Sequence, residues 1–195
     1  MTSSAPSVIA LAGPNGAGKS TAGPALVREA LGVTELVNAD VIAQGLSAFD
    51  PEGVALTAGK VMLTRLHELA SRRATFAFET TLAGRAYARW LTELKSTGYE
   101  IHILFLWLPT VELAIRRVSD RVRRGGHGIP AATIRRRYNA GLRNFFGPYR
   151  AMASTWRFYD NSSSQSPVFV AKGQGAVLDE CTDRERWLQL ERTYG

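Results

Sequence analysis

Several features are scarce in this sequence of 195 residues, and each scarcity excludes a class of protein. The single cysteine, Cys181, cannot form a disulfide within the chain, which fits a reducing cytoplasm. The longest apolar run, residues 101–109, is too short to cross a membrane and is interrupted by His102. The opening Met-Thr-Ser-Ser-Ala-Pro-Ser has no basic residue and does not resemble a signal peptide. Because 45% of the residues are apolar, wholesale disorder is also excluded, and we expect one cytoplasmic domain over residues 1–195.

Lysine is rare as well, since only four of the 24 basic residues are lysines. The net charge of +7 is therefore carried by arginine, and it is concentrated in one segment. Between Glu112 and Arg157 there are 11 arginines and two acids, whereas the rest of the chain has 13 basic and 15 acidic residues. Such a segment is typical of a nucleic-acid surface, a phosphate-handling site or a solvated helix face. Composition alone does not choose between these three.

Short apolar runs alternate with helical patterns along the chain. Strands are predicted over 7–12, 35–38, 75–78, 101–108, 157–159 and 168–171, and helices over 19–31, 41–46, 51–73, around 87–94, 111–124, 130–144 and 184–190. This alternation indicates an α/β fold, a P-loop kinase-like three-layer sandwich with a mainly parallel sheet of five or six strands. Because ligands bind beyond the carboxyl ends of such strands, the residues that follow each strand are the candidates for chemistry.

Residues 13–20, Gly-Pro-Asn-Gly-Ala-Gly-Lys-Ser, match the phosphate-loop pattern G-x-x-x-x-G-K-[ST] in full, between a predicted strand and a predicted helix. Glycines let backbone N–H groups surround phosphate oxygens, and the start of the helix favours negative charge. Lys19 is expected to bridge the β- and γ-phosphates, and the Ser20 hydroxyl to bind Mg²⁺. The alternative, a glycine-rich turn without a ligand, does not explain why motif and context coincide. We expect a nucleoside triphosphate to be bound by Gly13, Pro14, Asn15, Gly16, Ala17, Gly18, Lys19, Ser20 and Thr21.

Two motifs of other P-loop proteins are missing. The sequence has neither the Leu-Ser-Gly-Gly-Gln of transporter-type ATPases nor the Asn-Lys-x-Asp of small guanine-nucleotide switches. What remains favours phosphorylation of a small molecule. Asp40 directly follows the second predicted strand and is expected beside the phosphate loop, where a carboxylate can accept the proton of a substrate hydroxyl or help to hold Mg²⁺. The structural alternative for Asp40 is that it caps the helix over 41–46.

Three further polar residues end the third predicted strand. Glu79 is the candidate for a second carboxylate at the Mg²⁺ site, reached directly or through water. Thr80 and Thr81 can bind hydroxyl groups of the acceptor, and Arg85 can bind an anionic group of the acceptor. Capping and surface charge of the next helix are the alternative for Thr81 and Arg85.

The arginine-rich segment contains two predicted helices joined by Gly125-Gly-His-Gly128. Glycines between two arginine-bearing helices are typical of a lid that closes over a triphosphate, and we place this lid at about 112–150. Arg117, Arg121 and Arg124 lie at i, i+4 and i+7 on one helix face and are expected to face the ligand, because guanidinium groups bind phosphoryl oxygens. At least half of the 11 arginines are expected to be merely solvated. His127 is expected to be either a lid contact or a surface residue of the hinge.

In their order and spacing, these motifs resemble the zeta toxin family of P-loop kinases, in a short stand-alone form. The resemblance rests on 13–21, Val37-Asn-Ala-Asp40, Phe76-Ala-Phe-Glu-Thr-Thr81, Arg117 and Arg121 with 125–130, and Tyr159-Asp-Asn161, and it spans about residues 7–171. It implies ATP- or GTP- and Mg²⁺-dependent phosphorylation of the 3′-hydroxyl of UDP-N-acetylglucosamine, a nucleotide-sugar, and an antitoxin protein as a partner. It also implies Lys19 as the phosphate-binding lysine, Asp40 as the base, Glu79 and Thr80 at the acceptor site, lid arginines at the γ-phosphate and Asn161 in the loop beside the adenine. The chain lacks the larger acceptor-binding insertions of the best-known members, which leaves a different nucleotide or small metabolite open as the acceptor.

The competing hypothesis is a nucleotide-binding ATPase module whose arginines bind nucleic acid. Few aromatic residues are interleaved with the arginines for base stacking, since Tyr138, Phe145 and Phe146 come only later in the segment. We therefore expect a kinase that binds neither nucleic acid nor a membrane.

Overall fold

The structure, a computed structural model, describes residues 5–31, 33–163 and 166–195. Its first half contains β1 (Ser7–Ala12), α1 (Lys19–Leu31), β2 (Leu36–Val37), α2 (Ala39–Leu46), α3 (Ala55–Ser71), β3 (Phe76–Thr80), α4 (Ala86–Ser96) and β4 (Glu100–Trp107). Its second half contains α5 (Val111–Arg123), α6 (Ala131–Asn144), a short π-helical turn η1 (Phe145–Tyr149), α7 (Arg150–Met152), β5 (Thr155–Asp160), β6 (Val168–Gln174), β7 (Val177–Cys181) and α8 (Arg184–Tyr194). The opening Met-Thr-Ser-Ser and positions 32, 164 and 165 lie outside the described residues.

The strands of the described residues form one sheet of seven in the order β2-β3-β1-β4-β5-β6-β7. The first five strands in this order are parallel, and β6 and β7 are antiparallel to their neighbours. The α/β class and the mainly parallel sheet are thus confirmed, but the predicted number of five or six strands was too low. The additional strand, β7, is the edge strand Val-Leu-Asp-Glu-Cys, whose polar side chains do not form the apolar run by which buried strands are found.

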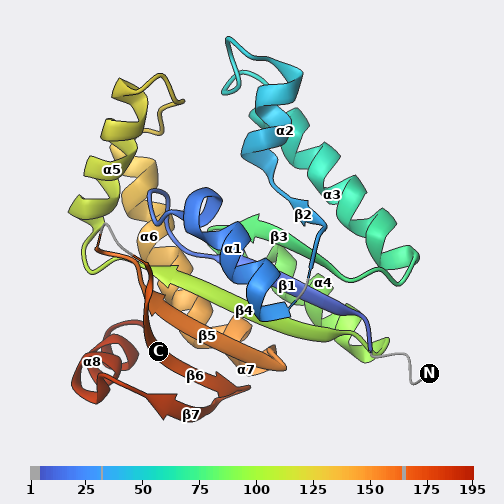
Figure 1. Ribbon diagram of the computed structural model, residues 1–195, viewed down its shortest axis with the longest axis vertical. Coiled ribbons are helices and arrows are strands. Elements are labelled where there is room, and N and C mark those ends of the chain that lie inside the picture. Colours follow the sequence, from blue (N-terminus) through green and yellow to red (C-terminus); the bar gives the residue numbers. More distant parts are fainter. Residues whose placement is uncertain (1–4, 32, 164–165) are drawn as a thin grey trace.

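Helices cover both faces of the sheet, which confirms the three-layer arrangement. Helix α1 lies on one face, whereas α4, α6 and α7 lie on the other (Figure 1). The contact of α1 with β1 is close, because a Cβ atom at Gly23 would lie 2.3 Å from Leu11 Cδ2. The pair α2–α3 rises from one side of the sheet and α5 and α6, the helices of the predicted lid, rise from the other, with α1 and the loop before it between them (Figure 1).

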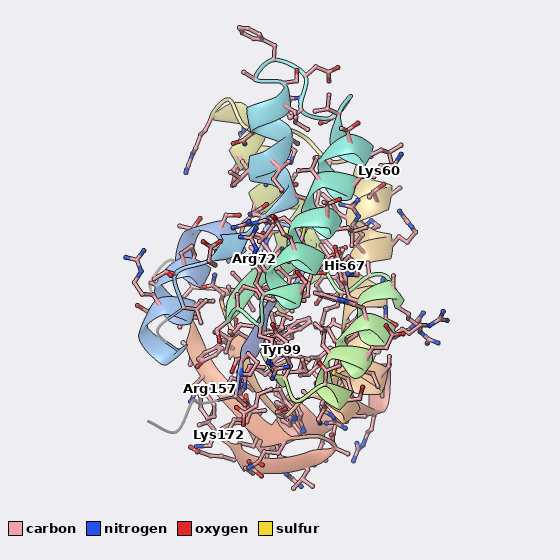
Figure 2. The ribbon with its side chains drawn as sticks, turned by 90° about the vertical axis from the view of Figure 1, so that its right-hand side faces the viewer. Lys60, His67, Arg72, Tyr99, Arg157 and Lys172 are labelled. Carbon is pink, nitrogen blue, oxygen red and sulfur yellow. The ribbon has the colours of Figure 1, made fainter. Side chains whose placement is uncertain are left out.

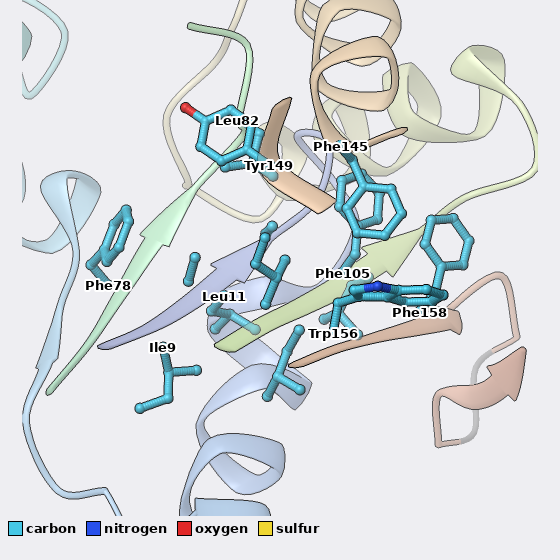
Figure 3. Close-up of a cluster of buried hydrophobic side chains, with 14 of the residues drawn as sticks. Ile9, Leu11, Phe78, Leu82, Phe105, Phe145, Tyr149, Trp156 and Phe158 are labelled. Atoms are coloured by element: carbon cyan, nitrogen blue, oxygen red, sulfur yellow. The ribbon is translucent and has the colours of Figure 1, made fainter. Parts of the chain in front are cut away.

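Aromatic side chains form much of the core on the side of α6 and α8. Phe105 and Phe158 stack with their ring centroids 5.1 Å apart, and Phe145 packs against both (Figure 3). Trp156 of β5 stacks on Trp187 of α8 at 5.2 Å with an angle of 2° between the rings. These fully buried contacts attach the C-terminal β6–β7–α8 part to the same core as the parallel sheet.

Two helix starts differ from the sequence prediction. Helix α3 begins at Ala55 and not at Pro51, because Asp50 Oδ1 accepts a hydrogen bond from the N–H of Gly53 and the intervening residues form a turn. Helix α2 begins at Ala39, two residues before the predicted start. Among the residues that the structure covers, none of the helices is both long enough and apolar enough to span a bilayer.

Candidate active site

The phosphate loop connects β1 to α1, as the motif predicts. Gly13, Gly16 and Gly18 have φ values of +140°, +77° and +78°, a region that side chains strongly disfavour. A Cβ atom at Gly13 would lie 2.1 Å from the Leu106 carbonyl oxygen, so the loop needs glycine there for packing as well. Among the hydrogen bonds between described residues, none uses the N–H of Gly16 or Gly18 as its donor. These N–H groups are therefore available to phosphate oxygens.

Lys19, at the first position of α1, is buried, with 7% of its surface exposed. Its Nζ donates a hydrogen bond to the Pro14 carbonyl oxygen over 3.0 Å and lies 3.7 Å from Glu79 Oε1. Burial lowers the pKa of the Lys19 ammonium, and the nearby carboxylates of Glu79 and Asp40 oppose this effect. A buried cation in this position is stabilised by an added anion, as expected for a lysine that binds phosphate.

Ser20 and Glu79, the two predicted Mg²⁺ ligands, are in direct contact. The Ser20 hydroxyl donates to Glu79 Oε2 over 2.9 Å, and only 10% of the Glu79 side chain is exposed. One hydroxyl and one carboxylate oxygen at the start of a phosphate-binding helix suit Mg²⁺, which prefers oxygen ligands and usually completes its shell with phosphate and water. Within the described part of the chain there is no group of three or more histidine, cysteine, aspartate or glutamate side chains that could hold a metal ion alone.

Asn38 connects this pair to Asp40, and the sequence analysis gave it no role. Its Nδ2 donates to Glu79 Oε2 over 2.6 Å, and its Oδ1 accepts from the N–H of Asp40 over 2.7 Å. Asn38 is therefore the N-cap of α2, and the alternative that Asp40 caps this helix was wrong. An asparagine at the end of a predicted strand and two residues before a candidate base was the available signal.

Asp40 lies in the first turn of α2 and was expected beside the phosphate loop, but β2 does not pair with β1, the strand that leads into that loop. Strand β3 pairs with both β1 and β2, so β3 separates the Asp40 strand from the phosphate-loop strand. The Asp40 carboxylate, 48% exposed, still influences Lys19 electrostatically and lies 3.6 Å from Nε2 of His127. The first turn of α2 therefore reaches across β3 and brings Asp40 close enough to the phosphate loop to act on Lys19.

Two cavities open beside Asp40 between the α2–α3 pair and the lid hinge. The first has a volume of about 300 Å³, and the second, of about 480 Å³, adjoins it through Pro51, Glu52 and His127, which line both. The smaller cavity is lined by Asp40, Glu52, His127, Thr133 and Arg137 together with apolar residues, among them Ala39, Ala43 and Ile129. A molecule in this cavity would meet Asp40 directly.

The three lid arginines that were predicted to face the ligand are used differently. Arg121 is close enough to Lys19 to lower the pKa of that ammonium, and its Nε is buried without a hydrogen-bond partner among the described residues. Arg117 instead donates to the carbonyl oxygens of Asn161 and Ser162, over 2.7 and 2.8 Å. Arg124 follows the last turn of α5 and is exposed. Arg121 is thus the one of the three whose charge acts on Lys19 of the phosphate loop, whereas the ligand contacts of all three stay predictions.

Most of the other arginines in the segment are solvated, as expected. Of the 11, seven are exposed: Arg116, Arg123, Arg124, Arg135, Arg136, Arg143 and Arg157. Some of these form surface ion pairs, such as Arg135 with Glu112 at 2.7 Å. Arg157 lies toward the end of the molecule remote from the α2–α3 pair (Figure 2). The exposed guanidinium groups are therefore found on β5 as well as on and beside α5 and α6.

Asn161, which follows β5, contacts the phosphate loop. Its Nδ2 donates to the Ala17 carbonyl oxygen over 2.7 Å, and a Cβ atom at Gly18 would lie 2.6 Å from this nitrogen. The preceding Asp160 accepts from the Ser162 N–H and forms an ion pair with Arg186 of α8 at 3.1 Å. The C-terminal helix thus helps to hold the loop in which a nucleotide base is expected.

The remaining predicted acceptor residues have local structural partners. Thr80 Oγ1 accepts from the Leu82 N–H over 3.1 Å, and Arg85 Nε donates to Asn144 Oδ1 over 3.2 Å. The carbonyl oxygen of Thr81 packs on Gly141, where a Cβ atom would lie 2.4 Å away. None of the three lines either cavity beside Asp40, so their acceptor contacts stay predictions.

Comparison with known proteins agrees with this fold. The model of the AAA domain family (AAA_33) matches residues 8–146. An uncharacterized protein of Haemophilus influenzae is 27% identical over 126 residues, which are 65% of this chain and 88% of that protein. Among solved structures, the AvrRxo1-ORF1:-ORF2 complex with ATP superposes with a TM-score of 0.75 at 18% identity, covering 95% of this chain and 63% of that one. The PezAT chromosomal toxin-antitoxin system of Streptococcus pneumoniae superposes with a TM-score of 0.62 at 19% identity, covering 98% and 86%.

These similarities differ in what they establish. At identities below 20% the two solved structures support the P-loop kinase-like fold alone, and this chain spans only 63% of the AvrRxo1 chain. The family match covers well over half of the sequence and includes the phosphate loop, Asp40, Glu79 and the lid helices. The chain therefore belongs to the AAA domain family, with a P-loop kinase-like fold.

Proposed function

We propose that the protein is an ATP- or GTP-dependent, Mg²⁺-dependent kinase that transfers the γ-phosphate to a hydroxyl group of a small molecule. The observation that carries this proposal is the arrangement of Lys19, Ser20, Glu79 and Asp40, joined through Asn38 at the carboxyl ends of β1, β2 and β3. A site that only binds nucleotide needs the first three of these groups but has no use for a carboxylate that lines the smaller cavity.

Each residue has a defined task in this proposal. Lys19 and the loop N–H groups bind phosphate oxygens, and the Arg121 guanidinium, whose charge already acts on Lys19, binds them from the lid. Ser20 and Glu79 would hold Mg²⁺, which when bound neutralises phosphate charge. Asp40 accepts the proton of the acceptor hydroxyl as the oxygen bonds to the γ-phosphorus, and the electron pair of the broken O–P bond stays on the nucleoside diphosphate.

The acceptor is proposed to bind in the two adjoining cavities. The hydroxyl would lie in the smaller one beside Asp40, and a nucleotide-sugar such as UDP-N-acetylglucosamine would extend into the larger one. The basis for this acceptor class, with the 3′-hydroxyl as the site of transfer, is the resemblance of the sequence motifs to those of zeta toxins. Arg137, which lines the smaller cavity, can bind an anionic group of the acceptor.

We also propose an antitoxin-like protein partner and a cytoplasmic location. The partner is supported by the fold similarity to a toxin-antitoxin system and to the AvrRxo1-ORF1:-ORF2 complex. The location is supported by the single, half-buried cysteine.

The decisive experiment is incubation of the full chain with labelled ATP, Mg²⁺ and a metabolite extract, followed by mass spectrometry of phosphorylated products. Transfer by the wild type and none by Asp40→Asn, at equal nucleotide binding, is the expected result. A random oligonucleotide titrated over a salt series serves as the opposing test. Tight binding with steep salt dependence, together with no transfer, would favour the nucleic-acid-binding ATPase instead.

A further inference from the structure

His127 lies on the wall that the two cavities share, between the candidate base and the lid. Its Nε2 is 3.6 Å from Asp40 Oδ2 and 3.4 Å from Nη2 of Arg121. Arg121 Nη2 also donates to the His127 carbonyl oxygen over 3.1 Å. One ring nitrogen thus faces both a carboxylate and a guanidinium.

These two contacts exclude one another chemically. Nε2 donates to Asp40 only when it carries a hydrogen, and it accepts from Arg121 only when it does not. Both forms exist for the uncharged imidazole, because the hydrogen can be on either ring nitrogen. The tautomer of His127 therefore depends on which partner holds Nε2 more strongly.

The backbone around His127 keeps the ring in this place. The N–H of Gly126 donates to the Arg121 carbonyl oxygen over 3.0 Å, and a Cβ atom at Gly126 would lie 2.6 Å from Arg121 Cγ. Gly125 turns the chain with a φ of +85°. The His127 side chain is only 14% exposed. It is thus packed between α2 and α5 and is not a solvated hinge residue.

We propose that His127 is a positioning residue that couples the lid to Asp40. Without nucleotide, Arg121 occupies Nε2 and leaves the half-exposed Asp40 carboxylate free to rotate. Phosphate oxygens bound near Lys19 attract the Arg121 guanidinium, which releases Nε2. The ring then donates from Nε2 to Asp40 and holds the carboxylate in one orientation toward the acceptor cavity. This role rests on the proposed kinase function, whereas the contact itself does not.

The contact is tested by ¹H–¹⁵N NMR of the imidazole rings in the full chain, which has only three histidines. Asp40→Asn is expected to move the Nε2 resonance of His127 toward the form without hydrogen. Arg121→Lys, and separately addition of Mg²⁺ with the non-hydrolysable analogue AMP-PNP, are expected to move it the opposite way. His67, on α3, and His102, on β4, are internal controls whose resonances stay unchanged. If the Nε2 resonance of His127 has the same chemical shift in Asp40→Asn, in Arg121→Lys and in the wild type, the proposal is overturned.

The role is tested by the rate of ADP formation from ATP in the presence of Mg²⁺ and the metabolite extract. His127→Ala is expected to lower kcat about 10- to 100-fold with little change in KM for ATP. The substitution removes the hydrogen-bond donor that orients the Asp40 carboxylate and leaves the contacts to the phosphates intact. His127→Gln, whose amide nitrogen can donate to Asp40, is expected to recover most of the rate. The matched control is His67→Ala on the exposed part of α3 (Figure 2), which should match the wild type.

The outcomes of the two experiments separate the two proposals. A wild type that binds AMP-PNP but forms no ADP overturns the proposed function, and the NMR shifts still decide whether the His127 contact exists. Full activity of His127→Ala, or equal losses in the alanine and glutamine variants, overturns the positioning role.

Discussion

The carboxamide of Asn38 donates a hydrogen bond to Glu79 over 2.6 Å, while the oxygen of the same group caps the helix that carries Asp40. One buried side chain therefore fixes the position of the candidate metal ligand relative to the candidate base. Glu79 lies near the end of β3 and Asp40 follows β2, so the relation between the two carboxylates depends on this link.

Asn38→Ala should lower both stability and activity. Loss of the cap is expected to reduce the free energy of unfolding by about 1 kcal/mol. Loss of the hydrogen bond to Glu79 is expected to lower turnover about 10- to 100-fold. Asn38→Asp, in comparison, retains the cap but places a second carboxylate against Glu79. Urea denaturation and ADP formation measured on both variants separate the effects, and an active, stable Asn38→Ala protein would contradict the link.

Lys19→Met should abolish function and raise stability. The ammonium is buried with a lowered pKa, so an apolar side chain of similar length removes a desolvation penalty, and Glu79 keeps its donors Ser20 and Asn38. Affinity for the nucleotide, measured by calorimetry, is expected to fall about 100-fold, since a charge-assisted contact is lost. Lys60→Met on the exposed surface of α3 is the matched control and should change neither quantity. Unaltered nucleotide affinity of Lys19→Met would exclude Lys19 from the phosphate site.

Asp40→Asn should keep nucleotide affinity within about twofold and lower phosphoryl transfer by a factor of about 100 or more, because an amide cannot accept the hydroxyl proton. Its melting temperature should stay near that of the wild type, since Asp40 is 48% exposed and Asn38, not Asp40, caps α2. Unchanged transfer in this variant would rule out Asp40 as the base.

The same substitution in two helix interiors should act in opposite directions. Gly59→Ala in α3 is expected to stabilise the protein by about 0.5–1 kcal/mol, because nothing lies within 4 Å of the added methyl group and alanine favours helix. Gly23→Ala in α1 places the methyl group 2.3 Å from Leu11 Cδ2 and is expected to destabilise by about 1–3 kcal/mol. Thermal unfolding of the two variants provides the comparison, and equal effects would contradict the close packing of α1 on β1.

His102 should make stability depend on pH. Burial lowers the pKa of the His102 imidazole below its ordinary value of 6.5, so below that pH the unfolded chain binds a proton that the folded protein resists. This contribution is fully present above pH 6.5 and is lost as the pH falls toward the folded pKa. The expected result is that the free energy of unfolding of the wild type decreases with acidification more steeply than that of His102→Gln. Parallel pH profiles of the two proteins would show that His102 is not responsible.

Much of the site was predictable from the sequence because its elements are local. The phosphate loop, its strand and its helix lie within residues 7–31, and eight consecutive positions carry the motif. Glu79 was predictable in the same way, from a polar residue at the end of an apolar strand. The role of Asn38 and the direction of Arg117 were not, because each depends on partners 41 or 44 positions away.

The α/β class, the phosphate loop and the clustering of polar residues at the strand ends follow from the amino-acid sequence alone, since alternation and glycine geometry act over a few residues. Three relations follow only from the folded chain: β3 separates β2 from β1, the charge of Arg121 acts on Lys19 while Arg117 binds the loop after β5, and His127 lies beside Asp40. These relations depend on strand order and on how the lid packs, and the free energy that selects them is distributed over the whole core.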